Sequence, residues 1–249
     1  MNLPNFLIAG APRAGTTFLY KMLDQHPDVY LAKPLSPEPK FFLIDDEFQK
    51  GPGYYSEKYF SGADGRAAVG EKSTNYLEAP CVPGRIRQLL PGVKLLFTLR
   101  NPIERAYSNY LWSKQNRLES LSFDEAVEKE AVREAQYSPS YRYSRPFSYV
   151  SRGMYAAHLR PYLAAFPMEQ IKVLFLEDLE DRPQAEIDAI CRYLGVQRHS
   201  SSDLHGRVNS ARAGDEQIEG STRAKLQEIY REPNRELADL LKRDLSHWS

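Results

Sequence analysis

Residues 5–17 read NFLIAGAPRAGTT, an apolar run followed by a short loop with two glycines in GxxxxG spacing. The run Asn5–Ala9 is rich in branched and aromatic side chains, which predicts a buried strand. Thr16–Gln25 follows the loop and repeats its apolar residues at helical spacing. The glycines let the backbone curl so that N–H groups point inward, and the first N–H groups of the helix add the positive end of its dipole. This strand–loop–helix unit is therefore expected to hold an anion.

The loop has the glycine spacing of the phosphate-binding P-loop, with Thr17 at the hydroxyl position of that motif. Thr16 occupies the position of the P-loop lysine, which reaches the β- and γ-phosphates of ATP. Arg13 is the only cation in the loop. The loop is thus predicted to bind phosphate without the usual residue for γ-phosphoryl transfer. A glycine-rich turn without a ligand is the alternative, and the strand–loop–helix context favours phosphate over it.

Further short apolar runs alternate with helical patterns along the chain. Strands are expected at Ala67–Glu71, Val93–Arg100 and Ile171–Leu176. Helices are expected at Arg85–Leu90, Pro102–Lys114, Phe123–Ala135, Met154–Phe166, Gln184–Leu194 and Leu226–Leu241, the last kinked or split at Pro233. Continuous apolar strands separated by helices are typical of a parallel sheet covered on both faces. We therefore predict an α/β fold, a P-loop-like parallel sheet flanked by helices on both faces, in a single domain over residues 1–249. Ligands of such sheets bind beyond the carboxyl ends of the strands.

Charge and composition narrow the function classes. Lys plus Arg count 33 and Asp plus Glu count 33, so the formal net charge is zero. A nucleic-acid partner usually selects a basic domain, so no nucleic acid is expected, and any anion must be held by local groups. Cys81 and Cys191 form no disulfide framework, and no metal-ligand spacing occurs. Because no signal peptide or membrane-spanning run is recognised, we expect a soluble, cytoplasmic protein without membrane insertion.

Four motifs follow one another along the chain: Gly10–Tyr20, Glu38–Phe42 (EPKFF), Gly70–Tyr76 (GEKSTNY) and Leu99–Ser108 (LRNPIERAYS). In this order they resemble the motifs of the PAPS-dependent sulfotransferases. The nearest branch is the carbohydrate sulfotransferases of the heparan sulfate type and their bacterial relatives. The resemblance implies the sulfotransferase fold, with PAPS as the sulfuryl donor and PAP as its product. PAPS carries a 5′-phosphosulfate and a 3′-phosphate, so it needs two separate anion sites.

The first of these sites is implied to be the glycine-containing loop. Its arginine would neutralise the 5′-phosphate and the bridging oxygen as the sulfuryl group leaves. The family more often has a lysine at this position. Arginine stays protonated at working pH, so it stabilises the leaving group by its charge but is a poor proton donor. The residues expected to bind the 5′-phosphosulfate are Arg13, Ala14, Gly15, Thr16 and Thr17.

The second implied site holds the 3′-phosphate with Arg100 and Ser108. Arg100 ends a buried strand, where an unpaired charge is unfavourable, and Ser108 returns to the same helix face two turns after the helix begins. An arginine fork and a hydroxyl suit a terminal phosphate. On spacing alone, an ion pair between Arg100 and Glu104 or another nearby acid is an equal alternative. Gly206 and Arg207 are expected to close over the same phosphate.

Glu38 is the expected general base. Sulfuryl transfer to a hydroxyl or an amine needs a proton removed as the nucleophile attacks, and a carboxylate in a partly apolar setting can remove it. The resemblance assigns this role to Glu38, and it assigns Lys72 to contact with the transferring sulfonate or the acceptor. The alternatives are a surface acid on a proline-rich loop for Glu38, and a Glu71–Lys72 pair at a strand end for Lys72.

The segment Tyr137–Arg152 (YSPSYRYSRPFSYVSR) combines aromatic rings with arginines. Such a segment suits a sugar, an aromatic or an anionic acceptor, and a solvated lid or loop aromatics packed on the core are an equal alternative. We expect single in-line sulfuryl transfer from PAPS to a hydroxyl, with an amine less favoured, of a carbohydrate or small-molecule acceptor, with no metal. A P-loop nucleotide or small-molecule kinase is the alternative function, and a non-catalytic nucleotide-binding protein is a third. The sequence predicts neither the acceptor nor the oligomeric state.

Overall fold

The structure, a computed structural model, describes residues 1–199 and 218–248. The chain divides into two units. Unit 1 comprises residues 1–99 and 161–209, and unit 2 comprises residues 100–160 and 210–249. Two of the predicted phosphate-binding residues, Gly206 and Arg207, lie outside the described residues, so their expected role stays a prediction.

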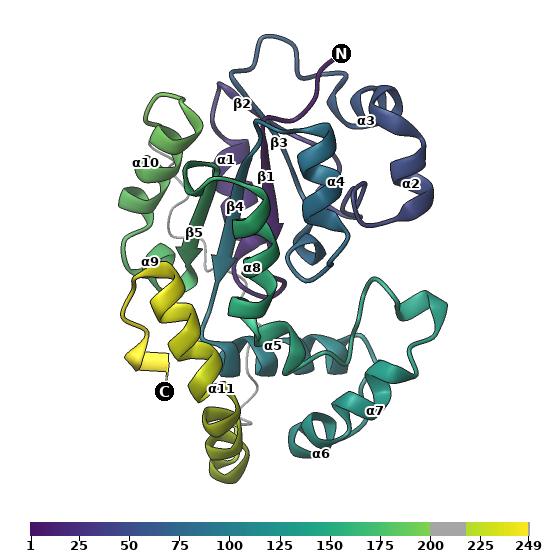
Figure 1. Cartoon of the computed structure of the whole chain (residues 1–249), viewed down its shortest axis with the longest axis vertical. Helices are drawn as coiled ribbons and strands as arrows, with labels where there is room; N and C mark the ends of the chain where they lie inside the picture. The colour runs from purple at the N-terminus through teal and green to yellow at the C-terminus, as the bar shows by residue number, and fades with distance from the viewer. Residues whose placement is uncertain (200–217, 249) are drawn as a thin grey trace. The chain divides into compact units, whose positions relative to one another are not determined.

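Unit 1 contains a sheet of five parallel strands in the order β2-β3-β1-β4-β5 (Figure 1). Four of these strands begin and end within one residue of the ranges that their apolar runs predict. The exception is β2, whose three residues are too few to give a periodic signal. The strands are β1 (Phe6–Gly10), β2 (Val29–Leu31), β3 (Ala68–Lys72), β4 (Lys94–Leu99) and β5 (Ile171–Phe175).

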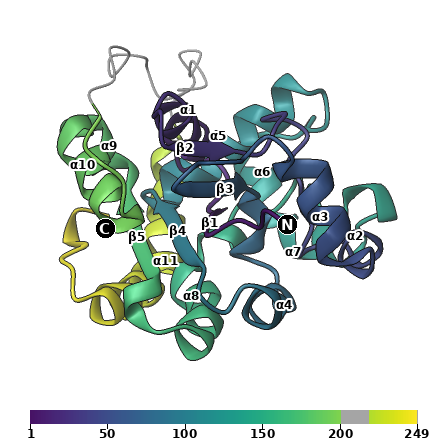
Figure 2. The ribbon, with the colours of Figure 1, turned by 90° about the horizontal axis from the view of Figure 1, so that it is seen from above.

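Helices cover both faces of this sheet, as predicted. Figure 2 shows α1 (Thr16–Asp24) on one face and α4 (Val82–Leu89) on the other. The apolar residues of α1 pack with β1 and with α10 (Pro183–Leu194) in one buried cluster, so this core fixes the direction in which α1 leaves the sheet. The α/β fold class is therefore confirmed. The remaining helical segments of unit 1, with 3₁₀ helices marked η, are α2 (Asp45–Gln49), α3 (Gly51–Phe60), η1 (Thr74–Tyr76), η4 (Met168–Gln170) and α9 (Leu176–Asp181).

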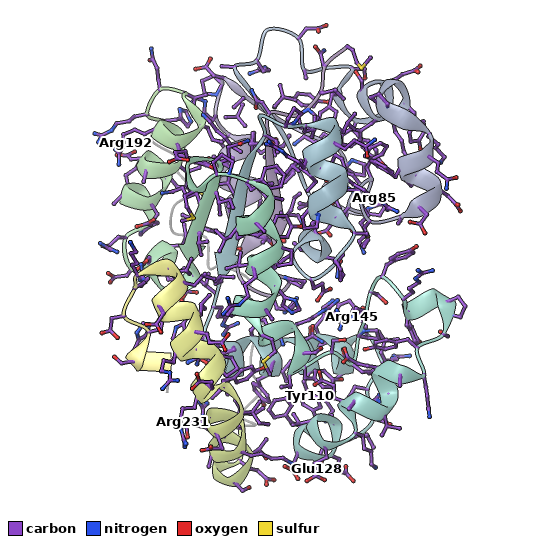
Figure 3. All side chains as sticks on the ribbon, viewed as in Figure 1. Arg85, Tyr110, Glu128, Arg145, Arg192 and Arg231 are labelled. Carbon is purple, nitrogen blue, oxygen red and sulfur yellow. The ribbon has the colours of Figure 1, made fainter. Side chains whose placement is uncertain are left out.

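Unit 2 is built from helices around a buried aromatic cluster. Tyr110, labelled in Figure 3, packs there against Phe123 and Tyr149 with ring centroids 5.1 and 6.2 Å apart. One of the boundaries between the two units, after Arg160, falls inside α8 (Tyr155–Ala165). The other helical segments are α5 (Pro102–Gln115), α6 (Phe123–Glu128), α7 (Glu130–Ala135), η2 (Pro139–Tyr141), η3 (Ser151–Gly153), α11 (Gly220–Leu241) and η5 (Ser246–Trp248).

Two helical ranges of unit 2 differ from the prediction. The range 123–135 is two helices, α6 and α7, which meet at Lys129. Pro233 lies inside an uninterrupted α11 instead of splitting it. Tyr230 and Leu237 on either side of this proline are both fully buried. Tertiary packing of an apolar face outweighs the hydrogen bond that the proline removes.

Candidate active site

The predicted phosphate loop begins at the carboxyl end of β1, where neighbouring backbone holds it on both sides. Ala11 N donates to Thr98 O of β4 at 2.8 Å, and Leu77 N donates to Ala9 O at 2.8 Å. Gly10 has a φ of 147°, and a Cβ atom there would lie only 2.6 Å from Leu77 Cβ. Glycine is therefore required at the point where β1 turns into the loop.

The loop ends at the N-terminus of α1 in a geometry that suits an anion. Gly15 is the N-cap residue with a φ of 84°, and no side chain caps the helix. The first N–H groups of a helix have no partner inside it, so here they can face a bound anion together with the positive end of the dipole. Thr16 is buried, and Arg13 is half-buried with a left-handed backbone. Binding of a phosphate or phosphosulfate group by these residues stays a prediction.

Glu38 and Lys72 form an ion pair at the carboxyl end of β3. The Glu38 carboxylate also accepts hydrogen bonds from Thr74, from the backbone N at 3.1 Å and from Oγ1 at 3.1 and 3.2 Å. Both side chains are mostly enclosed, with 14% of Glu38 and 7% of Lys72 exposed. Lys72 is in register with Ile8 of β1. The ion pair therefore lies at the carboxyl ends of the strands, where the phosphate loop also starts. The structure thus brings two of the predicted catalytic residues together, and Lys72 pairs with Glu38 instead of Glu71.

Glu71 is a fully buried carboxylate that the sequence considered only as a partner for Lys72. It accepts hydrogen bonds from three hydroxyls, Tyr55 OH at 2.8 Å, Ser73 Oγ at 2.6 Å and Tyr76 OH at 2.7 Å. Burial raises the pKa of Glu71 to about 7, because the charged form loses its hydration, while the hydroxyl bonds act in the opposite direction. Strand periodicity is the signal that points to this arrangement, since neighbours along a strand face opposite sides of the sheet.

The predicted 3′-phosphate residues lie in unit 2, with Arg100 just before α5 and Ser108 in the middle of that helix. Asn101 caps this helix as expected, because its side chain accepts hydrogen bonds from two backbone N–H groups of the first turn. Ser108 is buried on α5 and Arg100 is half-buried. Glu104, the alternative partner of Arg100, is paired with Arg223 at 2.8 Å. The structure thus pairs Glu104 with Arg223 and not with Arg100. Phosphate binding by Arg100 and Ser108 stays a prediction.

The aromatic segment Tyr137–Arg152 is held by acidic side chains of unit 2. Arg145 pairs with Glu134 at 2.6 Å. Three consecutive backbone N–H groups near the end of the segment donate to the buried Glu130 carboxylate. Burial raises the pKa of Glu130, and the backbone hydrogen bonds oppose that rise. This bonding gives the segment a structural role inside unit 2, and its role in acceptor binding stays a prediction.

Residues 1–199 and 218–248 contain neither a cluster of metal-ligating side chains nor a helix suited to span a membrane. No group of three or more His, Cys, Asp or Glu side chains there is arranged to hold a metal ion. No helix in the same ranges is both long enough and apolar enough to cross a membrane. The expectation that the reaction needs no metal stays a prediction.

Comparison with known proteins identifies the family to which this combination of fold and motifs belongs. Residues 3–212 match the family described as the sulfotransferase domain. Mouse heparan sulfate glucosamine 3-O-sulfotransferase 3A1 is 30% identical over 196 residues, which are 79% of this chain and 47% of that protein. The chain thus spans about half the length of this curated relative.

Solved structures agree with this match. A crystal structure of a sulfotransferase from Alicyclobacillus acidocaldarius is 32% identical with a TM-score of 0.85, and the match covers 100% of this chain and 99% of that one. Mouse sulfotransferase SULT7A1, solved in complex with PAP, is 15% identical with a TM-score of 0.52 over 82% of this chain and 63% of its own, a likeness of fold alone. The predicted family and fold are confirmed, and this chain belongs to the sulfotransferases, a family of enzymes.

Proposed function

We propose that this chain transfers a sulfuryl group from PAPS to a hydroxyl of a carbohydrate or small-molecule acceptor, with Glu38 as the general base. The observation that carries the proposal is the Glu38–Lys72 ion pair, which lies at the carboxyl ends of the strands, where the phosphate loop starts. A carboxylate held by an ammonium group and by the donors of Thr74 lies there near a predicted anion site. Removal of a proton beside a phosphosulfate needs these groups close together.

PAPS is the proposed donor because the motifs predict a separate set of residues for each of its two anionic ends. The loop after β1, with Arg13, would receive the 5′-phosphosulfate. Arg100 and Ser108 of unit 2 would receive the 3′-phosphate, with Gly206 and Arg207 as further expected ligands. The mouse sulfotransferase that shares this fold is described as complexed with PAP, which supports the same nucleotide for this chain.

The proposed reaction is a single in-line displacement. The acceptor oxygen attacks sulfur and forms a new S–O bond, while the S–O bond to the 5′-phosphate breaks and its electron pair leaves with PAP. Glu38 takes the proton of the acceptor hydroxyl. Lys72 holds the carboxylate in place and neutralises charge on the sulfonate oxygens. Arg13 stabilises the departing phosphate by its charge, since a guanidinium is a poor proton donor.

A carbohydrate hydroxyl is supported by the name of the mouse relative, which describes 3-O-sulfation of heparan sulfate glucosamine. The chain matches only part of that protein, so the acceptor is proposed by class alone. The kinase alternative would need the P-loop lysine, whose position holds Thr16. The cytoplasmic location expected from the sequence stays a prediction.

Substitution of Glu38→Gln separates donor binding from catalysis. PAP should raise the Tm of the wild type without Mg²⁺, because a ligand that binds only the folded state adds to the free energy of unfolding. Glu38→Gln should keep this Tm shift, since glutamine preserves the shape of the side chain. It should lose about a hundredfold or more of the turnover, since general-base catalysis contributes about 10²–10⁴-fold. The measurements are thermal shifts with PAP, and PAP release from PAPS with a panel of carbohydrate and small-molecule acceptors.

Glu57→Gln is the matched control, because it makes the same chemical change at an exposed position of α3. It should leave both the PAP-induced Tm shift and the turnover at wild-type values. Stabilisation by ATP and Mg²⁺ but not by PAP would contradict the proposed donor. Wild-type turnover in Glu38→Gln would reject Glu38 as the base.

A further inference from the structure

Glu71 is a buried acid that the proposed reaction does not use directly. We propose that it is a positioning residue, which acts through Ser73 and Tyr76 to fix the backbone segment after Glu38 and thereby the direction of the Glu38 carboxylate. The inference rests on the proposed function, because it gives Glu71 a role in that reaction. Glu71 is 0% exposed, so it acts through its neighbours and not on the acceptor.

Two hydroxyls connect Glu71 to the segment that follows the proposed base. Ser73 Oγ donates to Glu71 at 2.6 Å and accepts from Lys40 N at 2.8 Å. Tyr76 OH donates to Glu71 at 2.7 Å and accepts from Phe42 N at 3.2 Å. The anchored N–H groups belong to residues two and four positions beyond the base. Because consecutive Cα atoms are about 3.8 Å apart, these anchors limit where the base can lie.

The segment needs such anchors near the base. The backbone of Lys40 is left-handed, with a φ of 50°, a conformation that residues with a Cβ seldom adopt. Phe41 stacks on Tyr55 with ring centroids 4.0 Å apart. Arg85 of α4, labelled in Figure 3, donates from Nη1 to Phe42 O at 3.1 Å. These contacts hold the far end of the segment, at Phe41 and Phe42, whereas the hydroxyl of Ser73 holds Lys40 N, two residues from the base.

The charge of Glu71 sets the direction of the bonds in this network. An ionised carboxylate only accepts, so both hydroxyls turn their hydrogens toward it and keep lone pairs for the backbone N–H groups. A protonated carboxyl or a glutamine amide would donate a hydrogen of its own to one of these hydroxyls. That hydroxyl would then lose the acceptor for its own hydrogen in a buried place, which is unfavourable. The hydrogen-bond arrangement that anchors the N–H groups of Lys40 and Phe42 therefore requires the ionised form of Glu71.

Ionisation of Glu71 falls near neutral pH. Burial raises its pKa to about 7, and the charge of Glu38 adds to that rise. Among the described residues, the other ionisable groups bonded in this network are Tyr55 of α3, Tyr76 of η1, Lys72 of β3, which is paired with Glu38, and Arg85 of α4, which donates to Phe42 O. Turnover is expected to rise with pH through about 7, because ionisation of Glu71 lets the two hydroxyls anchor the backbone segment after Glu38.

Removal of single hydroxyls tests the two links. Ser73→Ala and Tyr76→Phe should each lower kcat by about tenfold or more, because a misplacement of about 1 Å can cost about a hundredfold in rate. The KM for PAPS should change by less than about twofold, because the phosphate loop is untouched. Tyr55→Phe is the matched control, since among the described residues Tyr55 OH bonds Glu71 but no backbone N–H of the segment. It should lower kcat by less than about threefold.

Glu71→Gln tests the charge itself. It should lower kcat and abolish the rise of turnover through pH 7, a change in the pH profile that a merely weakened fold would not produce. Thermal melts verify that each variant is folded at the assay temperature. Equal losses in Tyr55→Phe and Ser73→Ala, or a wild-type pH profile in Glu71→Gln, would overturn the positioning role.

Glu38→Gln distinguishes this inference from the proposed function. If the wild type releases PAP and Glu38→Gln does not, the proposed function stands. Wild-type kcat in both Ser73→Ala and Tyr76→Phe would then overturn the positioning role alone. If the wild type releases no PAP with any acceptor of the panel, both proposals are overturned.

Discussion

Glu38 and Glu71 both lie near the carboxyl end of β3, but in opposite surroundings. Glu38 has the Lys72 ammonium beside it, so its charge is matched by an opposite charge. Glu71 is enclosed and meets the hydroxyls of Tyr55, Ser73 and Tyr76, which are neutral donors. Burial of a charge without a counter-charge is unfavourable, and this raises the pKa of Glu71 to about 7. The ionised form that orders the network is therefore also the form that weakens the fold.

This opposition predicts how stability depends on pH. Between its ordinary pKa of 4.5 and its folded-state value of about 7, Glu71 binds more protons in the folded than in the unfolded chain. The free energy of unfolding should therefore fall as pH rises through this window, by on the order of 3 kcal/mol from this residue. Glu71→Gln should remove that part of the slope. Urea unfolding of both proteins at pH 5 and pH 8 measures it, and parallel pH dependence would contradict the assignment.

Residues distant in sequence show where prediction from the sequence stops. The motifs indicate Glu38 and Lys72 separately, but no local pattern indicates that residues 34 positions apart form an ion pair. Alternation along a strand does place Glu71 and Lys72 on opposite faces, which argues against the pair considered from the sequence. The role of Ser73 as a link to Lys40 depends entirely on the folded path of the chain.

At the scale of elements, the strength of the local signal decided what was predictable. Three strands (β1, β4 and β5) come from mainly apolar runs, whereas β3 (AVGEK) has a weaker signal. The helix after Asn101 begins with a cap and a proline at its first position, so the sequence places it closely. No helix is predicted over Gly51–Phe60, yet the structure has α3 there with Pro52 in its first turn. Pro233 shows the converse, a strong local breaker overruled by packing.

The strand–loop–helix element gives a further prediction. Gly10→Ala should lower the free energy of unfolding by about 2 kcal/mol or more, because the new Cβ would lie 2.6 Å from Leu77 Cβ and 2.9 Å from Thr74 O. Displacement of the loop should also abolish the PAP-induced Tm shift. Gly53→Ala in α3 is the control, since nothing lies within 4 Å of its Cβ position. This control should raise the free energy of unfolding by at most about 1 kcal/mol. Equal urea midpoints for the two variants would contradict this reading.

At the scale of the whole molecule, the ion pairs show how the balanced charge is distributed among the side chains. Several arginines that a count of cations would include are paired inside one unit, among them Arg145 with Glu134 and Arg223 with Glu104. The predicted anion ligands divide between the units, with Arg13 in unit 1 and Arg100 in unit 2. The sequence alone yields the total charge but not this distribution. An anionic nucleotide would thus be held by few local groups and not by the field of the whole protein.

That distribution predicts the salt dependence of PAP binding. A net charge of zero gives no long-range attraction to be screened, and partly buried contacts are screened much less than exposed ones. Raising NaCl from 0.1 to 1 M, which shortens the Debye length from about 10 to about 3 Å, should weaken PAP binding by about tenfold at most. Arg13→Ala should weaken binding at low salt and flatten this dependence, because it removes one of the few contributing charges. Calorimetric titration of PAP at both salt concentrations measures the two effects. A loss above a hundredfold in the wild type would show that broad electrostatic attraction holds the nucleotide instead.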